Sequence, residues 1–177
     1  MEVKKLMGEE LDLMVNYPKA KRNIEQRAAE KTNEERKIAR QFGKDFFDGD
    51  RRYGYGGYSY HSRFWEPVIS TFKKFYNLKN ESKILDVGCG KGFMLYDFIR
   101  LIPGITVAGI DISEYAITNA KDEVKPFVKL GDARELSFDD NSFDLVISIT
   151  TVHNLEREDC KKALQEIERV SSNGKFI

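Results

Sequence analysis

A glycine-rich loop and three acidic residues are the part of this 177-residue sequence whose types and spacing could bind a ligand. The loop, Gly88-Cys-Gly-Lys-Gly92, follows a short apolar run and precedes a helical pattern. Glycines at such a position let the backbone approach a ligand closely, and N–H groups at the start of a helix can bind an anion. Asp86 precedes the loop, whereas Asp111 and Asp132 follow later apolar runs. Their carboxylates can accept hydrogen bonds from hydroxyl or amino groups.

Two well-known phosphate-binding motifs do not fit this loop. The dinucleotide motif G-x-G-x-x-G needs its third glycine at position 93, where the sequence has Phe93. The P-loop needs Ser or Thr after its lysine, but Gly92 follows Lys91. A nicotinamide-dependent oxidoreductase is therefore disfavoured, and we expect no change in reduced-cofactor fluorescence on mixing.

The elements that must position these residues alternate between strand and helix. Apolar runs predict four strands, at residues 83–88, 105–110, 127–130 and 143–149. Helical patterns follow the first, second and fourth runs, at residues 93–102, 114–123 and 156–170. Ser113 can cap the second of these helices. One side of the third helix carries Cys160, Ala163, Leu164 and Ile167. This order predicts an α/β fold: a doubly wound, Rossmann-like, mostly parallel sheet with helices on both faces.

The sequence before the sheet divides into a charged and an aromatic segment. Residues 19–47 predict one long helix or two helical pieces, mostly solvated, with a thin apolar stripe that could contact the main domain or a partner chain. Residues 48–63 hold four glycines and four of the eight tyrosines, which predicts a loop. A helix over residues 65–76 follows, with Pro67 tolerated in its first turn.

The motifs along the sheet resemble those of the class I S-adenosylmethionine-dependent methyltransferases. Leu85-Asp-Val-Gly-Cys-Gly-Lys-Gly92 is similar to that family's first motif. Three later segments agree with the family in order and spacing, at residues 109–113, 131–136 and 142–155. The resemblance covers residues 82–177 and implies S-adenosylmethionine as cofactor and S-adenosylhomocysteine as product. We accordingly divide the chain into a helical extension (1–50), a Tyr/Gly-rich loop with a lead-in helix that could form a lid (51–80), and a cofactor-binding domain (81–177).

The resemblance implies a role for each cofactor residue. The residues concerned are Asp86, Gly88, Cys89, Gly90, Gly92, Asp111, Ile112, Asp132, Ala133 and Thr150. The glycine loop and the Thr150 backbone would lie along the methionine end, with Asp86 orienting the ammonium group. Asp111 would hold the ribose hydroxyls, Ile112 would pack on the adenine ring, and Asp132 with the Ala133 N–H would bind its edge. Taken singly, such acids are more often turn formers, and such glycines could serve only tight turns. Their joint placement at successive strand ends favours a binding site.

The residues that would act on the methyl acceptor are less well defined. His153 follows the fourth strand and is a candidate catalytic base, although packing or capping is the alternative role. Tyr53, Tyr58, His61 and Arg63 could belong to a lid or a substrate site, or to an ordinary surface loop. The predicted function is methyl transfer to an O or N atom of a small polar acceptor. The alternative is an S-adenosylmethionine-binding module without turnover.

Composition excludes several other classes of protein. The 29 basic and 29 acidic residues balance, which argues against binding to nucleic acid by bulk charge. No apolar stretch is long enough to span a membrane, and the acidic N-terminus does not resemble a secretory signal. Cys89 and Cys160 form neither a disulfide framework nor a metal-binding pair, so no metal is expected. These features predict a cytoplasmic protein.

Against the family's seven strands, in the order 3-2-1-4-5-7-6, this sequence stops at residues 174–177, which look like the first residues of strand five. Strand four is then expected to present an unpaired apolar edge. A truncated chain, a shortened natural variant that covers this edge by homodimerisation, and a partner chain that supplies the missing strands are the three explanations. We favour truncation.

Overall fold

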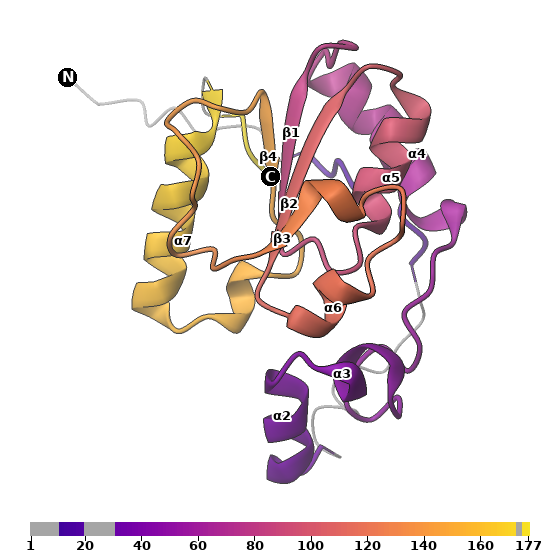
Figure 1. The fold of residues 1–177 in the computed structure, drawn as a ribbon, viewed down its shortest axis with the longest axis vertical. Helices are drawn as coiled ribbons and strands as arrows, with labels where there is room; N and C mark the ends of the chain where they lie inside the picture. Colours follow the sequence, from indigo (N-terminus) through magenta and orange to yellow (C-terminus); the bar gives the residue numbers. More distant parts are fainter. Residues whose placement is uncertain (1–10, 20–30, 173–174) are drawn as a thin grey trace, which may run out of the picture.

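The computed structural model describes residues 11–19, 31–172 and 175–177 and contains a four-stranded parallel sheet in the order β3-β2-β1-β4 (Figure 1). The strands are β1 (Lys83–Val87), β2 (Thr106–Asp111), β3 (Val128–Leu130) and β4 (Leu145–Ile147). Leu85 of β1 lies opposite Ala108 of β2 and Val146 of β4, which sets the register on both sides of the first strand. The predicted parallel α/β sheet is confirmed.

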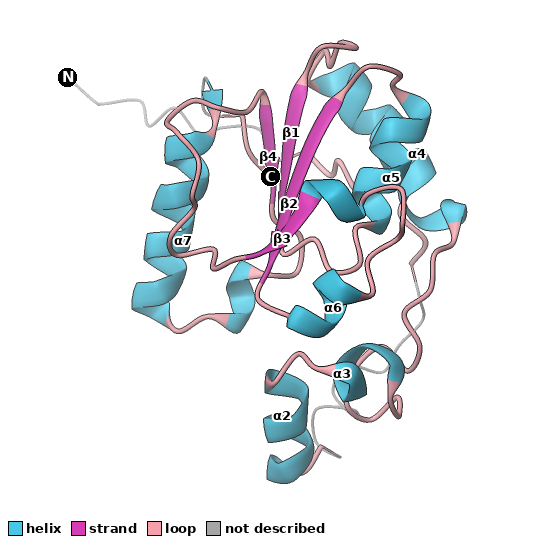
Figure 2. Cartoon of the chain, viewed as in Figure 1, coloured by secondary structure: helices cyan, strands magenta, loops and turns pink. Residues whose placement is uncertain are grey.

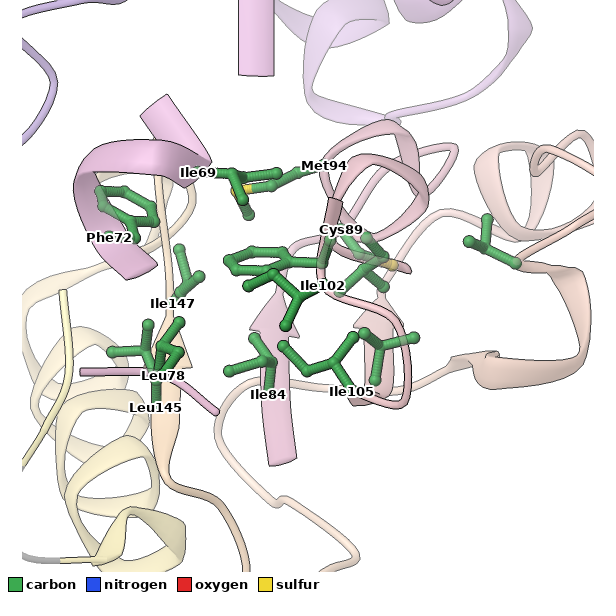
Figure 3. Close-up of a cluster of buried hydrophobic side chains, with 14 of the residues drawn as sticks. Ile69, Phe72, Leu78, Ile84, Cys89, Met94, Ile102, Ile105, Leu145 and Ile147 are labelled. Carbon is green, nitrogen blue, oxygen red and sulfur yellow. The ribbon is translucent and has the colours of Figure 1, made fainter. Parts of the chain in front are cut away.

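Helices cover both faces of the sheet (Figure 2). Side chains along each strand point alternately to opposite faces, and apolar side chains on both faces form two cores that the helices bury. Ile84 belongs to the core shared with α4 (Ser62–Phe75) and α5 (Phe93–Leu101), part of which Figure 3 shows. Leu85 belongs to the core shared with α7 (Arg157–Val170). The face of α7 differs from the prediction: Ile167 is buried, but the Leu164 side chain is 45% exposed.

Two predicted helices have different bounds in the structure. Helix α4 already begins at Ser62, so Pro67 lies in its second turn rather than its first. Helix α6 (Glu114–Thr118) is shorter than predicted, because the chain then turns so that Ala120 and Val124 are buried. The predicted cap is present: the Ser113 hydroxyl accepts a hydrogen bond from the N–H of Ala116 at 3.0 Å. A short 3-10 helix, η1 (Lys125–Phe127), leads into β3.

The N-terminal segment forms two short helices where the structure describes it. Helix α2 (Asn33–Arg40) begins with a capping box between Thr32 and Glu35 and buries none of its residues. Helix α3 (Lys44–Asp48) buries Phe47. Both helices lie beyond α6, on the side of the sheet to which the carboxyl ends of the strands point (Figure 1). The predicted helical positions 20–30 lie outside the described residues. None of the helices within the described ranges combines the length and apolar character needed to cross a bilayer.

The free edge of β4 is occupied, contrary to the expectation of unpaired backbone groups. The N–H of Val146 donates to the carbonyl of Lys175 at 3.1 Å, and the N–H of Ile177 donates to the carbonyl of Val146 at 3.0 Å. The N–H of Ser148 also donates to the carbonyl of Ile177 at 2.8 Å. Residues 175–177 therefore pair with β4 in parallel. The edge that motivated a homodimer is covered by the chain itself.

Candidate cofactor and acceptor site

A cavity of about 700 Å³ lies at the carboxyl ends of the strands. The strand order reverses here, because β2 and β3 lie on one side of β1 and β4 lies on the other. Ligands of doubly wound sheets bind at this place. The predicted cofactor residues that line the cavity are Asp86, Gly88, Cys89, Gly90, Asp111, Ile112, Asp132, Ala133 and Thr150. The structure thus brings together residues from three strand ends and the loop after β4. Gly92 is the predicted cofactor residue that lies outside the lining.

The glycine loop passes close to its neighbours at two positions that exclude side chains. Gly88 has a φ of +88°, and a Cβ built on it would lie 2.0 Å from Oγ1 of Thr151. A Cβ on Gly92 would lie 2.6 Å from Cγ2 of Val124, so this glycine serves the packing of the loop against the core. The side chain of Cys89 also packs in the core (Figure 3), and burial raises the pKa of its thiol. We therefore expect Cys89 to contact a ligand through its backbone.

The backbone N–H groups of the loop are used within the protein. Those of Gly88 and Cys89 donate to the carbonyl of Ile110 at 2.8 and 3.0 Å. The N–H of Gly90 donates to the Asp111 carboxylate at 2.7 Å. The sequence suggested that N–H groups here could bind an anion, but these three are already paired. The loop therefore presents bare Cα atoms rather than a cluster of free donors, which suits a ligand without phosphate groups.

Asp86 is buried and faces the cavity without a hydrogen bond or an ion pair to any of the residues that the structure describes. Its exposed fraction is 4%. Burial, with a smaller contribution from the nearby Asp111, raises the pKa of Asp86 to about 8. An ammonium group in the cavity would reverse this effect, because an opposite charge favours the ionised carboxylate. The residue therefore fits a cationic ligand group.

The adenine side predicted around Asp132 contains an arginine that sequence reasoning missed. Nε of Arg134 donates to both carboxylate oxygens of Asp132, at 2.9 and 3.0 Å, and the guanidinium also binds Asp159 of α7 at 2.7 Å. These hydrogen bonds lower the pKa of Asp132 despite its partial burial. Ile112 is 58% exposed at the cavity wall, where a flat ligand ring would cover it.

The loop after β4 forms another wall of the cavity. Thr150 has a φ of +57°, and the side-chain amide of Asn154 donates to the carbonyls of Thr150 and Thr151 at 3.1 and 3.2 Å. Thr151, Asn154 and Leu155 line the cavity although they were not predicted to. His153 is exposed and lies outside the lining, so the structure does not bring the candidate base to the cavity.

Aromatic residues from the first third of the chain cover the glycine loop. We call residues 42–58 the roof segment; its members in the lining are Phe42, Phe46, Phe47, Tyr55 and Tyr58. The rings of Tyr55 and Tyr58 are 4.3 Å apart, and Tyr58 stacks on Phe93 at 4.9 Å. The segment before residue 48 was predicted to be mostly solvated, which is wrong for Phe47. The predicted apolar stripe contained Phe42 and Phe46, which also line the cavity, but not Phe47.

Three of the four predicted lid residues lie outside the cavity lining. Tyr58 lines it. The guanidinium of Arg63 lies 4.8 Å from the ring centre of Phe64, and Nε2 of His61 lies 3.4 Å from the Ser59 hydroxyl. Tyr53 is half-buried outside the lining.

Part of the cavity lining is apolar and belongs to, or packs against, the core shared by α4 and α5; we call this part the apolar end. Its residues are Met14, Tyr17, Trp65, Met94 and Ile149. The rings of Tyr17 and Trp65 are 5.1 Å apart, and both pack against the core shared by α4 and α5. Met14, Tyr17, Trp65 and Met94 belong to none of the family motifs identified in the sequence, whereas Ile149 ends the predicted fourth strand. The cavity therefore joins an acidic, glycine-lined part to an apolar part.

Comparisons with known proteins agree with this geometry. A family described as "Methyltransferase domain" matches residues 85–177. The chain is 34% identical over 112 residues to tRNA (carboxymethyluridine(34)-5-O)-methyltransferase of Arabidopsis thaliana. This match covers 63% of this chain and 26% of that protein. It is 33% identical over 122 residues to demethylmenaquinone methyltransferase of Symbiobacterium thermophilum, covering 64% and 48%. The solved structure of PH0226 from Pyrococcus horikoshii has a TM-score of 0.55 at 29% identity, covering 75% of this chain and 60% of that one.

The chain spans less than half the length of these two curated relatives. The family match nevertheless extends over more than half of this sequence and includes the glycine loop and the ends of β2 and β4. The chain therefore belongs to the class I S-adenosylmethionine-dependent methyltransferase family.

Proposed function

We propose that this protein transfers a methyl group from S-adenosylmethionine to an O or N atom of a small acceptor bound at the apolar end. The observation that carries this proposal is the continuity of the cavity, whose lining includes both the acids Asp86 and Asp111 and the ring of Trp65. A donor and an acceptor can therefore lie in one continuous cavity. When bound, S-adenosylmethionine supplies a methyl group that its sulfonium has activated for displacement.

The residues of this chain would hold the donor along its length. Asp86 would bind the ammonium group, and Asp111 would accept from the ribose hydroxyls with the acceptor sites that Gly90 and Ser113 leave open. Ile112 would cover one face of the adenine ring. Asp132 and the Ala133 N–H would lie at its edge. In this assignment residues 81–177 bind the donor, and described residues of the segments 1–50 and 51–80, among them Phe47 and Tyr58, cover it.

The contribution of the protein to the reaction would be alignment and exclusion of water. Holding two reactants in line replaces a costly encounter in solution. The apolar end refines the acceptor predicted from the sequence: we propose a polar nucleophile on an apolar or aromatic body, because Tyr17 and Trp65 would bury such a body favourably. His153 stays a predicted base whose imidazole would have to reach the cavity through movement of the loop after β4.

The test combines donor binding with turnover. S-adenosylmethionine and S-adenosylhomocysteine are titrated by calorimetry into the wild type, Asp111→Asn and the control Asp139→Asn, whose side chain is exposed. We expect binding that Asp111→Asn weakens and Asp139→Asn leaves unchanged. Formation of S-adenosylhomocysteine is then measured with a set of phenols and aromatic amines and a set of small aliphatic amines and alcohols.

Turnover with the aromatic set alone would support the refined acceptor. Donor binding without turnover on either set would favour the alternative function, a binding module without catalysis. The absence of donor binding in the wild type would contradict the proposal.

A further inference from the structure

The lysine of the glycine loop makes an ion pair with the roof segment. Nζ of Lys91 lies 2.6 Å from Oδ2 of Asp48, the last residue of α3, and donates to the carbonyl of Tyr58 at 2.9 Å. The Lys91 and Asp48 side chains are 10% and 27% exposed. An ion pair removed from water to this extent is screened less by salt than a surface pair.

Asp48 collects further donors at the same place. The N–H of Tyr58 donates to Oδ1 at 2.9 Å, and the hydroxyl of Tyr115 of α6 donates to Oδ2 at 2.7 Å. Burial alone would raise the pKa of Asp48, but the hydrogen bonds from Lys91, Tyr58 and Tyr115 outweigh it and lower the pKa. The carboxylate therefore stays ionised at neutral pH.

These contacts set the position of the Tyr58 ring over the glycine loop. A Cβ built on Gly90 would lie 3.3 Å from Cε1 of Tyr58 and 3.5 Å from its hydroxyl oxygen. The ring packs on Phe47 and Phe93, with centroids 5.5 and 4.9 Å away. Tyr58 lines the cavity. Burial raises the pKa of the Tyr58 hydroxyl, and the nearby Asp86 carboxyl adds to this effect. The ring thus covers the end of the cavity assigned to the methionine part of the donor.

The stretch from Asp48 to Tyr60, which runs from within the roof segment to two residues beyond it, is tied down at both ends. Asp48 holds the first end of this stretch through Lys91, and the hydroxyl of Tyr60 donates to the buried carboxylate of Asp97 in α5 at 2.6 Å. The stretch between these ties carries the exposed glycines Gly56 and Gly57, whose positive φ values of +68° and +104° favour glycine. A ligand beneath Tyr58 would therefore be covered on the roof side while both ties are closed.

We infer that Lys91 is a positioning residue, whose ion pair with Asp48 closes the roof segment over the donor and slows its release. This inference rests on the proposed function. The pair suits reversible closure because both side chains regain water when the roof lifts, which offsets the loss of their mutual attraction. Because the glycine loop does not match the P-loop motif, the sequence assigned no role to Lys91. In the structure its ammonium group contacts Asp48 and Tyr58 of the roof segment.

Two measurements test this inference on the whole chain. The first is the dissociation rate of S-adenosylhomocysteine, measured by stopped flow, for the wild type, Lys91→Met, Asp48→Asn, the double variant and Lys91→Arg. We expect each single variant to raise this rate about tenfold, as loss of one partner of a largely buried pair does. The double variant should raise it no further, and Lys91→Arg should restore most of the slow release. Lys125→Met, which changes an exposed lysine, is the control.

The second measurement needs no ligand. Trypsin cleavage at Arg51 and Arg52, both exposed in the roof segment, reports its opening, and we expect Lys91→Met to be cut faster than the wild type and Lys125→Met. Equal cleavage and equal dissociation rates in the wild type and Lys91→Met would overturn the inference. If the wild type binds no S-adenosylhomocysteine but Lys91→Met is still cleaved faster than the wild type, the proposed function is contradicted. The role of the ion pair in closing the roof segment is then supported.

Discussion

Asp86 and Asp111 lie near the ends of neighbouring strands and are both buried, but only the Asp111 carboxylate is hydrogen-bonded within the part of the chain that the structure describes. Asp111 accepts hydrogen bonds from the N–H groups of Gly90 and Ser113 at 2.7 and 2.8 Å. Asp86 accepts none from the residues that the structure describes, and burial raises its pKa to about 8. The two acids that line the cavity therefore have different roles. Asp111 fixes the backbone of two loops, and Asp86 keeps its capacity for a ligand.

The first prediction is that donor binding at pH 7 releases a proton. Asp86 is protonated in the free protein because its pKa is about 8, and contact with the ammonium group of the donor would lower that pKa. Affinity should therefore rise as the pH is raised from about 6 to 8. Calorimetry in buffers of different ionisation enthalpy measures the released proton, and Asp86→Asn should abolish it. A heat of binding that is equal in all buffers would contradict this assignment.

The same residue makes stability depend on pH in the absence of ligand. The folded-state pKa of Asp86 lies above the ordinary value of 3.8, so between these two values the folded chain binds more protons than the unfolded chain. The free energy of unfolding should therefore fall as the pH rises from about 4 to 8. Urea unfolding at pH 5.5 and 7.5 measures this loss. It should be smaller in Asp86→Asn than in the wild type, and an equal loss would argue against a buried neutral carboxyl.

A third prediction concerns the closest approach in the glycine loop. Gly88→Ala would bring a methyl group to within 2.0 Å of the Thr151 hydroxyl at a φ of +88°, so the loops after β1 and β4 would have to separate. We expect donor affinity to fall by more than tenfold, together with a loss of about 1 to 3 kcal/mol in stability. Gly43→Ala is the matched control, because the added Cβ has nothing within 4 Å. Calorimetry and chemical denaturation of both variants decide the matter, and similar behaviour of the two would refute the proposed contact.

The fourth prediction concerns the second tie of the roof segment. Tyr60→Phe removes the donor to the carboxylate of Asp97, whose other oxygen is buried without a partner among the described residues. We expect the free energy of unfolding to fall by about 1 to 2 kcal/mol. Tyr53→Phe, outside the cavity, should change it little. Chemical denaturation provides the measurement, and unaltered stability of Tyr60→Phe would show that Arg100 alone satisfies Asp97.

Sequence patterns predicted the part of the site that depends on chain order. The carboxyl ends of parallel strands lie at the same edge of a sheet, independently of the packing elsewhere. Residues at these ends, such as Asp86 and Asp111, could therefore be identified from the motifs alone. The bounds of α6 and the role of Gly92 depended instead on the packing of Val124, which has no signature in local sequence.

The sequence predicted a lid from the Tyr/Gly-rich loop, but not which rings would line the cavity. Phe47 comes from a segment whose charge suggested solvent exposure, and Tyr17 belongs to no identified pattern, yet their rings contact residues far along the chain. The expectation of an unpaired β4 edge was wrong, because the residues that look like the start of strand five already pair with β4 through residues 175–177. Contacts between distant segments decided each of these features.

The distance along the chain between Asp48 and Lys91 has a consequence for synthesis. The roof segment leaves the ribosome 43 residues ahead of its partner, which corresponds to roughly 2 to 9 s at about 5–20 residues per second. During that interval the rings of Phe42, Phe46 and Phe47 have no glycine loop to cover, and the nascent chain presents them to solvent or to a chaperone. The order of the sequence thus places these apolar rings ahead of the loop that they cover.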